Sequence, residues 1–414
     1  MTRSAPHVRR ILVTKALRAF GDGYVSLLLP AYLLELGLDP LRVGIVATTT
    51  LIGSGVMTLL VGLTAYRVHY RTLLLAASVL MAGTGLGFAV VNDFWPLVVI
   101  ALVGTLNPSS GDVSVFLPLE HAVLARVIDD RERTAVFARY SLVGALVAAL
   151  GALAAALPAL AAEAWGVPGR TAMQGMFVLY ALLACLAAAA YRGLPRALVA
   201  DAQRASAPLT VSKRRVYVLA ALFSLDAFGG GFIVQSMLAL WLYQRFSLSI
   251  ASAGTLFFWT GVLTAVSFLV AVRIAGRFGL INTMVFTHLP SSLCLIAIPF
   301  MADLWPVIAL LFVRSALSQM DVPTRSSYVM AIVTPAERPA AASLTAVPRS
   351  LAAAVSPLLA GWLLGMSPFG WPLLIAGVVK IAYDAMLFAM FRKVRPPEEN
   401  APDDGRGAAG PRRR

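Results

Sequence analysis

Long apolar runs alternate with short polar stretches along the chain. Twelve apolar runs can be drawn, each of about 20 residues or slightly more, the length a helix needs to cross about 30 Å of hydrocarbon. We therefore predict twelve transmembrane helices. They lie at residues 11–34, 42–65, 72–91, 96–124, 135–161, 172–191, 216–242, 250–272, 280–301, 304–332, 340–364 and 371–391.

A polar segment divides these runs into two sets of six. It contains Pro195, Pro208 and the basic cluster Lys213-Arg214-Arg215, which is typical of a cytoplasmic linker. The segment from Lys393 onward is poor in apolar residues and is expected to be disordered. The predicted domains are an N-terminal six-helix bundle at 1–191, a linker at 192–215, a C-terminal six-helix bundle at 216–392 and a cytoplasmic tail at 393–414.

Composition agrees with a membrane protein. Hydrophobic residues make up 59% of the 414 residues and charged residues only 13%, which excludes an ordinary soluble domain. The net charge of +14 comes from arginines in short loops, so the positive-inside rule explains it and nucleic acid is not expected as a partner. The same rule predicts that both termini lie in the cytoplasm. We therefore expect a multi-pass protein of the cell (plasma or inner) membrane, surrounded by the lipid bilayer.

Two halves of the chain share a sequence pattern. Residues 17–24, LRAFGDGY, correspond to residues 225–232, LDAFGGGF. Trp95-Pro96 corresponds to Trp305-Pro306, at the start of the fourth and tenth runs. A duplicated unit predicts two pseudo-symmetric bundles around a central cavity, with a solute site between them. The fold class is therefore an all-α integral membrane protein.

Ionisable residues inside the runs concentrate in the first helix of each group of three. A charge near the bilayer centre costs at least about 2.5–3.5 kcal/mol, so such residues should face a shared polar cavity. The candidates for solute binding or proton coupling are Arg18, Asp22, Asp112, Asp226, Asp321 and Arg325. We expect Arg18 and Asp226 to meet across the cavity. Helix-breaking residues flank two of the acids, namely Asn107-Pro108 before Asp112 and Pro323 after Asp321.

Other charged residues have competing interpretations. Arg139, Arg314 and Arg349 could close gates or contact an anionic solute. Glu120 is expected near the cytoplasmic mouth, contacting a loop arginine. In the last run, Lys380 and Asp384 are four residues apart, and we interpret them as a structural pair because this helix is expected to be peripheral. The intramembrane histidines, among them His288, receive no specific role.

A short motif carries a resemblance to a known family. Residues 62–71, GLTAYRVHYR, follow the second run, and Ala275-Gly276-Arg277-Phe278-Gly279 follows the eighth. This resembles the loop motif of the major facilitator superfamily of secondary transporters, approximately G-x-L-A-D-R-x-G-R-R. The matching residues are Gly62, Arg67, Arg71, Arg277 and Gly279. The acid of the motif is missing in both copies. The resemblance implies a cavity lined by the first, fourth, seventh and tenth helices.

These observations predict a secondary transporter that works by alternating access as a monomer. Proton-coupled export of a small organic compound is the first hypothesis, because residues 356–361, SPLLAG, loosely resemble a G-P-x-x-G-G motif of antiporter members. Proton-coupled uptake or exchange of a small polar metabolite or anion is the alternative, and a non-transporting sensor or scaffold is a third. No catalytic residues, metal ligands or cofactors are predicted, and Cys185 and Cys294 are expected to be core residues.

Overall fold

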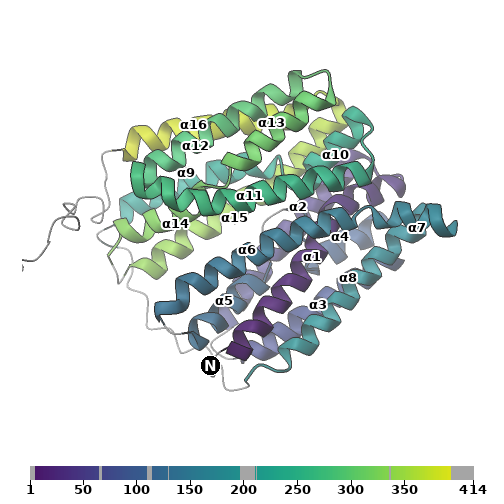
Figure 1. Ribbon diagram of the computed structural model, residues 1–414, viewed down its shortest axis with the longest axis horizontal. Helices are drawn as coiled ribbons and strands as arrows, with labels where there is room; N and C mark the ends of the chain where they lie inside the picture. Colours follow the sequence, from purple (N-terminus) through teal and green to yellow (C-terminus); the bar gives the residue numbers. More distant parts are fainter. Residues whose placement is uncertain are drawn as a thin grey trace, which may run out of the picture.

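The computed structural model describes residues 5–64, 68–109, 114–128, 130–195, 210, 212–334 and 337–392. Most of the predicted linker and the whole predicted tail at 393–414 lie outside these residues. The described part consists of long helices joined by short turns. Figure 1 shows the helices of the first half (purple to blue) below those of the second half (green to yellow).

The twelve predicted runs correspond to the observed helices. The first half contains α1 Ala5–Glu35, α2 Pro40–Thr64, α3 Tyr70–Val90, α4 Phe94–Val103, α5 Phe116–Val127, α6 Asp130–Ala154, α7 Leu157–Trp165 and α8 Gly169–Tyr191. The second half contains α9 Lys213–Gly231, α10 Gln235–Phe246, α11 Ile250–Phe278, α12 Leu280–Ala297 with the 3₁₀ turn Ile298–Phe300, α13 Leu304–Leu317, α14 Asp321–Ile332, α15 Arg338–Met366 and α16 Trp371–Phe391. The predicted twelve-helix membrane architecture is confirmed.

Four of the runs are broken into two helices. The fourth run is α4 and α5, and its break contains Asn107 and Pro108, as predicted, because a residue before proline favours an extended backbone. The tenth run breaks before Asp321 and not at Pro323. Pro323 lies in the first turn of α14, where its missing N–H is not needed. The breaks in the fifth run, after α6, and in the seventh run, after α9, were not expected from the sequence.

The two halves repeat one packing pattern. In the first half α1 packs against α6 and α8, and α3 packs against α8. In the second half α9 packs against α15 and α16, and α12 packs against α16. Glycines permit two of these close approaches. Gly23 of α1 packs against the backbone of Gly151 of α6, and Gly231 of α9 packs against Ser356 of α15. The duplicated sequence pattern therefore corresponds to a duplicated helix arrangement.

The halves meet through α2 with α15 and through α6 with α11. We call the side where α1 begins and α16 ends the terminal side, which is toward the left in Figure 1, and the opposite side the distal side. The contacts between halves lie in the distal part. Gly44 of α2 faces Gly361 of α15. The two backbones are so close that a Cβ added to Gly361 would lie only 2.9 Å from the Gly44 Cα. The Leu358 amide donates to the Thr48 hydroxyl at 2.8 Å.

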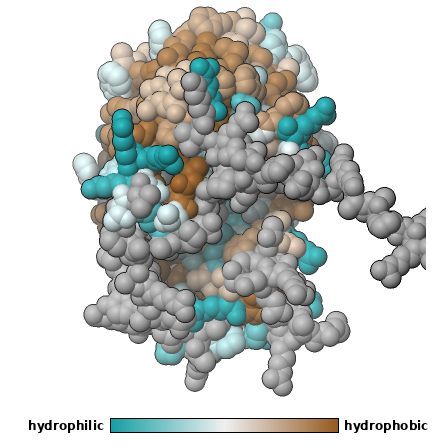
Figure 2. All heavy atoms as spheres, turned by 90° about the vertical axis from the view of Figure 1, so that its left-hand side faces the viewer, coloured by the Kyte–Doolittle hydropathy of each residue, from teal (hydrophilic) through white to brown (hydrophobic). Residues whose placement is uncertain are grey.

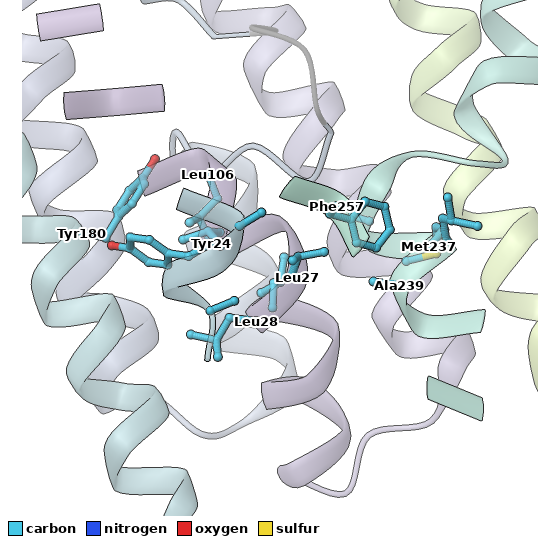
Figure 3. Close-up of a cluster of buried hydrophobic side chains, with 14 of the residues drawn as sticks. Tyr24, Leu27, Leu28, Leu106, Tyr180, Met237, Ala239 and Phe257 are labelled. Atoms are coloured by element: carbon cyan, nitrogen blue, oxygen red, sulfur yellow. The ribbon is translucent and has the colours of Figure 1, made fainter. Parts of the chain in front are cut away.

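An apolar cluster fills the distal region between the halves. Figure 3 shows Tyr24 and Leu27 of α1 between Tyr180 of α8 and side chains of the second half, Met237 of α10 and Phe257 of α11. All five belong to one continuous buried core. Figure 2 looks onto the terminal side and shows a hollow between the halves, with hydrophilic side chains in its depth. The structure is thus closed distally and open toward the terminal side.

Aromatic side chains mark the distal rim. Trp95, Trp165, Trp305 and Trp371 stand at the distal ends of their helices, and each is at least 43% exposed. Tryptophan is enriched where a membrane helix meets the headgroup layer, because its ring is amphipathic. We therefore expect these tryptophans to lie at the boundary between the hydrocarbon core and the headgroups on the distal side.

Candidate functional site

The first half contains a buried ion pair between Arg18 of α1 and Glu120 of α5. Arg18 is 2% exposed and Glu120 is fully buried. Arg18 also donates to the Ser114 hydroxyl at 3.2 Å, and its guanidinium lies 4.3 Å from the centre of the Phe116 ring. The Glu120 carboxylate therefore has a permanent cation beside it in a buried site.

Neutral donors complete the coordination of the Glu120 carboxylate. The Thr14 hydroxyl donates to it at 2.8 Å, and the hydroxyls of Tyr140 and Tyr191 donate as well. The donors come from α1, α6 and α8, so this network ties four helices of the first half together. Both carboxylate oxygens of Glu120 therefore accept hydrogen bonds, as a buried carboxylate requires.

The position of Glu120 corrects the sequence-based expectation of a charge at the mouth. Because α5 begins only at Phe116, Glu120 falls one turn into that helix, on the face that carries Phe116 and Val123. This face packs inward. Arg131 and Arg133, the expected partners of Glu120, have side chains outside the described residues.

The second half contains a larger buried cluster, which we call the ion cluster. Its six members are each at most 8% exposed and come from four helices. They are Asp226 of α9, His288 of α12, Asp321 and Arg325 of α14, and Lys380 and Asp384 of α16. Such a group of charges is stable in a low-dielectric region only when its members are paired with one another.

Asp226 lies at the centre of the ion cluster. Its Oδ1 accepts a hydrogen bond from Lys380 Nζ at 2.7 Å and lies 3.6 Å from His288 Nε2. Its Oδ2 lies 3.3 Å from Arg325 Nη1. Arg325 also pairs with Asp321 one turn away on α14, as the i, i+4 spacing predicts. Asp226 thus connects α9 to α12, α14 and α16.

His288 and Asp384 form the far side of the cluster. His288 Nδ1 lies 3.0 Å from both carboxylate oxygens of Asp384. Its Nε2 lies 3.4 Å from Lys380 Nζ. From the sequence, no role was expected for His288, and Lys380 and Asp384 were expected to be a structural pair because the last helix was expected to be peripheral. In fact α16 packs against both α9 and α12, which carries these side chains inward.

The predicted contact between Arg18 and Asp226 is not formed. Each of the two side chains finds its partners within its own half, in Glu120 for Arg18 and in Lys380 and Arg325 for Asp226. Both residues are buried, so neither borders the open hollow in this conformation. Asp321 is buried with Asp226, whereas Asp22 on α1 is half-buried. Asp112 lies outside the described residues.

The three additional arginines occupy different surroundings. Arg139 shares a face of α6 with Leu146 and Leu150, which are exposed in the closed distal region and therefore face lipid. A long basic side chain on that face extends toward the headgroups. Arg314 shares the inward face of α13 with the buried Leu311. Arg349 is exposed on α15, close enough to Asp226 and Arg325 for electrostatic interaction.

The loop-motif residues lie at helix ends. Gly62 is in the last turn of α2, Arg67 is outside the described residues, and the Arg71 guanidinium donates to the Leu194 carbonyl at 3.5 Å. Gly279 joins α11 to α12 with φ +83°, a conformation that favours glycine. Arg277, two residues earlier, stacks on the Phe278 ring at 5.5 Å.

Comparison with known proteins decides the family. The family model for the Major Facilitator Superfamily matches residues 11–313 and, in an overlapping second match, residues 219–413. The chain belongs to this superfamily. A membrane protein of Saccharomyces cerevisiae described as uncharacterized is 25% identical over 411 residues, covering 91% of this chain and 92% of that protein.

Solved structures of other superfamily transporters share the fold. The nucleoside transporter NupG superposes with a TM-score of 0.71 at 14% identity, covering 93% of this chain and 99% of that one. The human organic anion transporter MFSD10 gives 0.65 at 18% identity, covering 94% and 100%. The Escherichia coli xylose transporter XylE gives 0.68 at 14% identity, covering 92% and 96%. These identities show the shared fold and nothing about the solute.

Membership of the superfamily fixes the general activity. The chain is a multi-pass membrane protein and a secondary transporter that works by alternating access, and its fold and family are those of a transporter and not of an enzyme. The hollow on the terminal side and the closed distal contacts are the features that alternating access requires of one of its states.

Proposed function

We propose that this transporter couples the movement of a small organic solute to protons, and that the ion cluster of the second half binds the proton. The observation that supports this is the charge of the cluster. Three aspartates face two permanent cations, Lys380 and Arg325, together with the imidazole of His288. The cluster has one excess negative charge while the imidazole is neutral and is balanced when it is protonated. A buried group with such an imbalance favours binding a proton.

Export of a small organic compound is the proposed direction. The stretch 356–361 supports it through its position, since it joins the two halves. The Ser356 hydroxyl donates to the Phe228 carbonyl of α9 at 2.6 Å, and Gly361 contacts Gly44 of α2. A segment placed between these helices moves whenever the halves rock, which is the role expected of an antiporter motif.

Uptake or exchange of a small anion is the second candidate. Within the described residues Arg314 forms no ion pair, and its Nε is buried without a hydrogen-bond partner. Arg349 is exposed beside the ion cluster. Two guanidinium groups without a carboxylate partner favour an anionic solute.

We further propose a monomer in the cell membrane with both termini in the cytoplasm, so that the terminal side is the cytoplasmic side. The bundles would comprise residues 1–191 and 216–392, joined by the linker 192–215. Arginines before α1 and after α16 support this orientation. Protease protection of terminal epitope tags in intact cells tests the orientation, because accessible tags would reverse it.

Transport itself is tested with purified protein in liposomes under an imposed pH gradient. The solutes should include nucleosides, pentoses, small carboxylates and lipophilic cations. We expect one class to accumulate only while the gradient lasts, and a protonophore to abolish the accumulation. Accumulation that is unaffected by the protonophore would contradict proton coupling. If none of the solutes moved, the hypothesis of a non-transporting sensor or scaffold would be favoured. For the anion candidate, carboxylate binding should be lost in Arg349→Ala and kept in the lipid-facing control Arg139→Ala.

A further inference from the structure

We infer that the imidazole of His288 is the proton-binding site, and that a proton on its Nε2 and the ammonium of Lys380 are alternative partners of Asp226. This inference rests on the proposed proton coupling and names the group and the switch. It follows from the positions of the two imidazole nitrogens, of Lys380 Nζ and of the two aspartates on either side.

Asp384 fixes which nitrogen of the ring is free to accept a proton. Its carboxylate is fully buried, and both of its oxygens lie 3.0 Å from His288 Nδ1. A carboxylate can only accept hydrogen bonds when ionised, so Nδ1 carries the hydrogen in this arrangement. The lone pair of the neutral ring is then on Nε2, which points toward Lys380 and Asp226.

Lys380 occupies the place that a second imidazole proton would need. Its Nζ lies 2.7 Å from Asp226 Oδ1 and 3.4 Å from His288 Nε2. With a neutral ring the ammonium can donate to both atoms. With a protonated ring two cations would stand side by side in a buried site, which is strongly unfavourable. The proton on Nε2 therefore displaces Lys380, and Nε2–H donates to Asp226 Oδ1, which is now 3.6 Å away.

The exchange of partners alters which helices are joined. Lys380 belongs to α16 and His288 to α12, whereas Asp226 belongs to α9. Before protonation the ionic contact connects α9 with α16, and afterwards it connects α9 with α12. Arg325 holds the other oxygen of Asp226 in both states, at 3.3 Å here. Proton binding is thus converted into a change of helix contacts in the second half.

Charged and titratable groups from several helices surround the imidazole and set its affinity for the proton. They are Asp226 of α9, Lys380, Tyr383 and Asp384 of α16, and, on the other side of Asp226, Asp321 and Arg325 of α14. Arg349 of α15 lies near Asp226 and Arg325, and α13 and α11, which also pack against α12, carry Arg314 and Arg273. Lys380 and Asp384 are the two that contact ring nitrogens directly. They act in opposite directions, since the ammonium opposes the proton and the carboxylate favours it.

The test measures proton binding to the imidazole directly, so the solute does not have to be known. Histidine ring signals are followed by nuclear magnetic resonance as a function of pH in protein reconstituted in nanodiscs with ¹³C-labelled histidine. The His288 signal is assigned by its loss in His288→Asn. The matched control is His121→Asn, which removes an intramembrane histidine of α5 packed between Phe137 and Tyr140.

We expect the His288 signal to titrate, with its midpoint moved to higher pH by Lys380→Met and to lower pH by Asp384→Asn. Each shift should be at least about one pH unit, a tenfold change in proton affinity. An imidazole that stays in one protonation state between about pH 5 and pH 9, or a midpoint unmoved by Lys380→Met, would overturn the inference. Should His288→Asn not assemble, the two shifts in Lys380→Met and Asp384→Asn still decide the question.

A flux experiment separates this inference from the proposed function. In liposomes His288→Asn should keep solute exchange without a gradient and lose gradient-driven accumulation by about tenfold or more. Wild-type protein that shows no coupling to protons would refute the proposed function. Wild-type protein that is coupled, together with a fully coupled His288→Asn, would refute only the role of His288.

Discussion

The two halves of the molecule contain buried ion networks of different composition. In the first half one carboxylate, that of Glu120, is held by Arg18 and by hydroxyl groups that carry no charge. In the second half three carboxylates share two permanent cations and an imidazole. Neutral donors do not compete with the arginine, so the first network is a fixed connection. Cations that compete for Asp226 allow the second network to exchange partners.

The difference begins at one position of the repeat. Arg18 and Asp226 occupy the same place in the duplicated segments of α1 and α9, with opposite charges. This inversion suggested a contact between the halves. Each half instead supplies the opposite charge from its own helices, through Glu120 in the first half and Lys380 in the second. The halves are therefore joined by small residues and apolar packing in the distal region, and their ion networks remain internal.

The largest effect is expected from removing the cation of the first-half network. Arg18→Met leaves the buried Glu120 carboxylate without a counter-charge, so the variant should lose about 3–5 kcal/mol of stability. Thermal unfolding in detergent measures the loss. The double variant with Glu120→Gln removes both charges and should recover most of it. A single variant as stable as the wild type would show that the pair does not hold the first half together.

The second variant acts on the exchanging network. Asp226→Asn removes the negative charge for which Lys380 and the His288 proton compete, while Arg325 keeps Asp321 as its partner. Gradient-driven accumulation should fall about tenfold or more, with exchange in the absence of a gradient retained. Wild-type kinetics of gradient-driven transport in this variant would remove Asp226 from the coupling mechanism.

The contact between halves can be tested apart from both networks. A Cβ on Gly361 would lie 2.9 Å from the Gly44 Cα, so Gly361→Ala should push α2 and α15 apart at a cost of about 1–3 kcal/mol. Spin-label distances across the distal side should then shift toward the distally open state. Gly365→Ala is the matched control, because its Cβ meets no atom within 4 Å. Equal stability and equal spin-label distances in the two variants would contradict a role of Gly361 in distal closure.

The smallest expected effects come from two buried tyrosines. Tyr191→Phe removes one donor to Glu120 and should destabilise the protein by about 1 kcal/mol without changing proton coupling. Tyr383→Phe, beside His288, should cost close to nothing, because the buried Tyr383 hydroxyl has no hydrogen-bond partner among the residues that the structure describes. Chemical denaturation of the two variants in parallel gives the comparison. A larger cost for Tyr383→Phe would mean that its hydroxyl is bonded in another state.

Much of the fold could be predicted from the sequence, because span length and loop charge follow directly from the thickness and polarity of the bilayer. The pairing of Asp321 with Arg325 was equally accessible, since both lie on one face of one helix. The breaks after α6 and α9 were less visible. There the chain interrupts a continuous apolar run without a proline at the break itself.

The ion cluster could not be assembled from the sequence. Its members come from four helices, and only the packing of α16 on α9 and α12 brings Lys380, Asp384 and His288 together. One signal was present: an acid, a lysine and a histidine occur within apolar runs outside the first helix of each triplet, where each is costly. Glu120 was misplaced because its orientation depends on the residue at which α5 begins.

We expect the ion cluster of the second half, and not the network of the first, to respond to protons during the transport cycle. The direct measurement is the distance between spin labels at Leu60 of α2 and Val347 of α15, on the terminal side, between about pH 5 and pH 9. We predict a distance distribution that changes with pH in the wild type and in Tyr191→Phe, and that becomes independent of pH in His288→Asn. A pH response that survives in His288→Asn, or one that disappears in Tyr191→Phe, would contradict it.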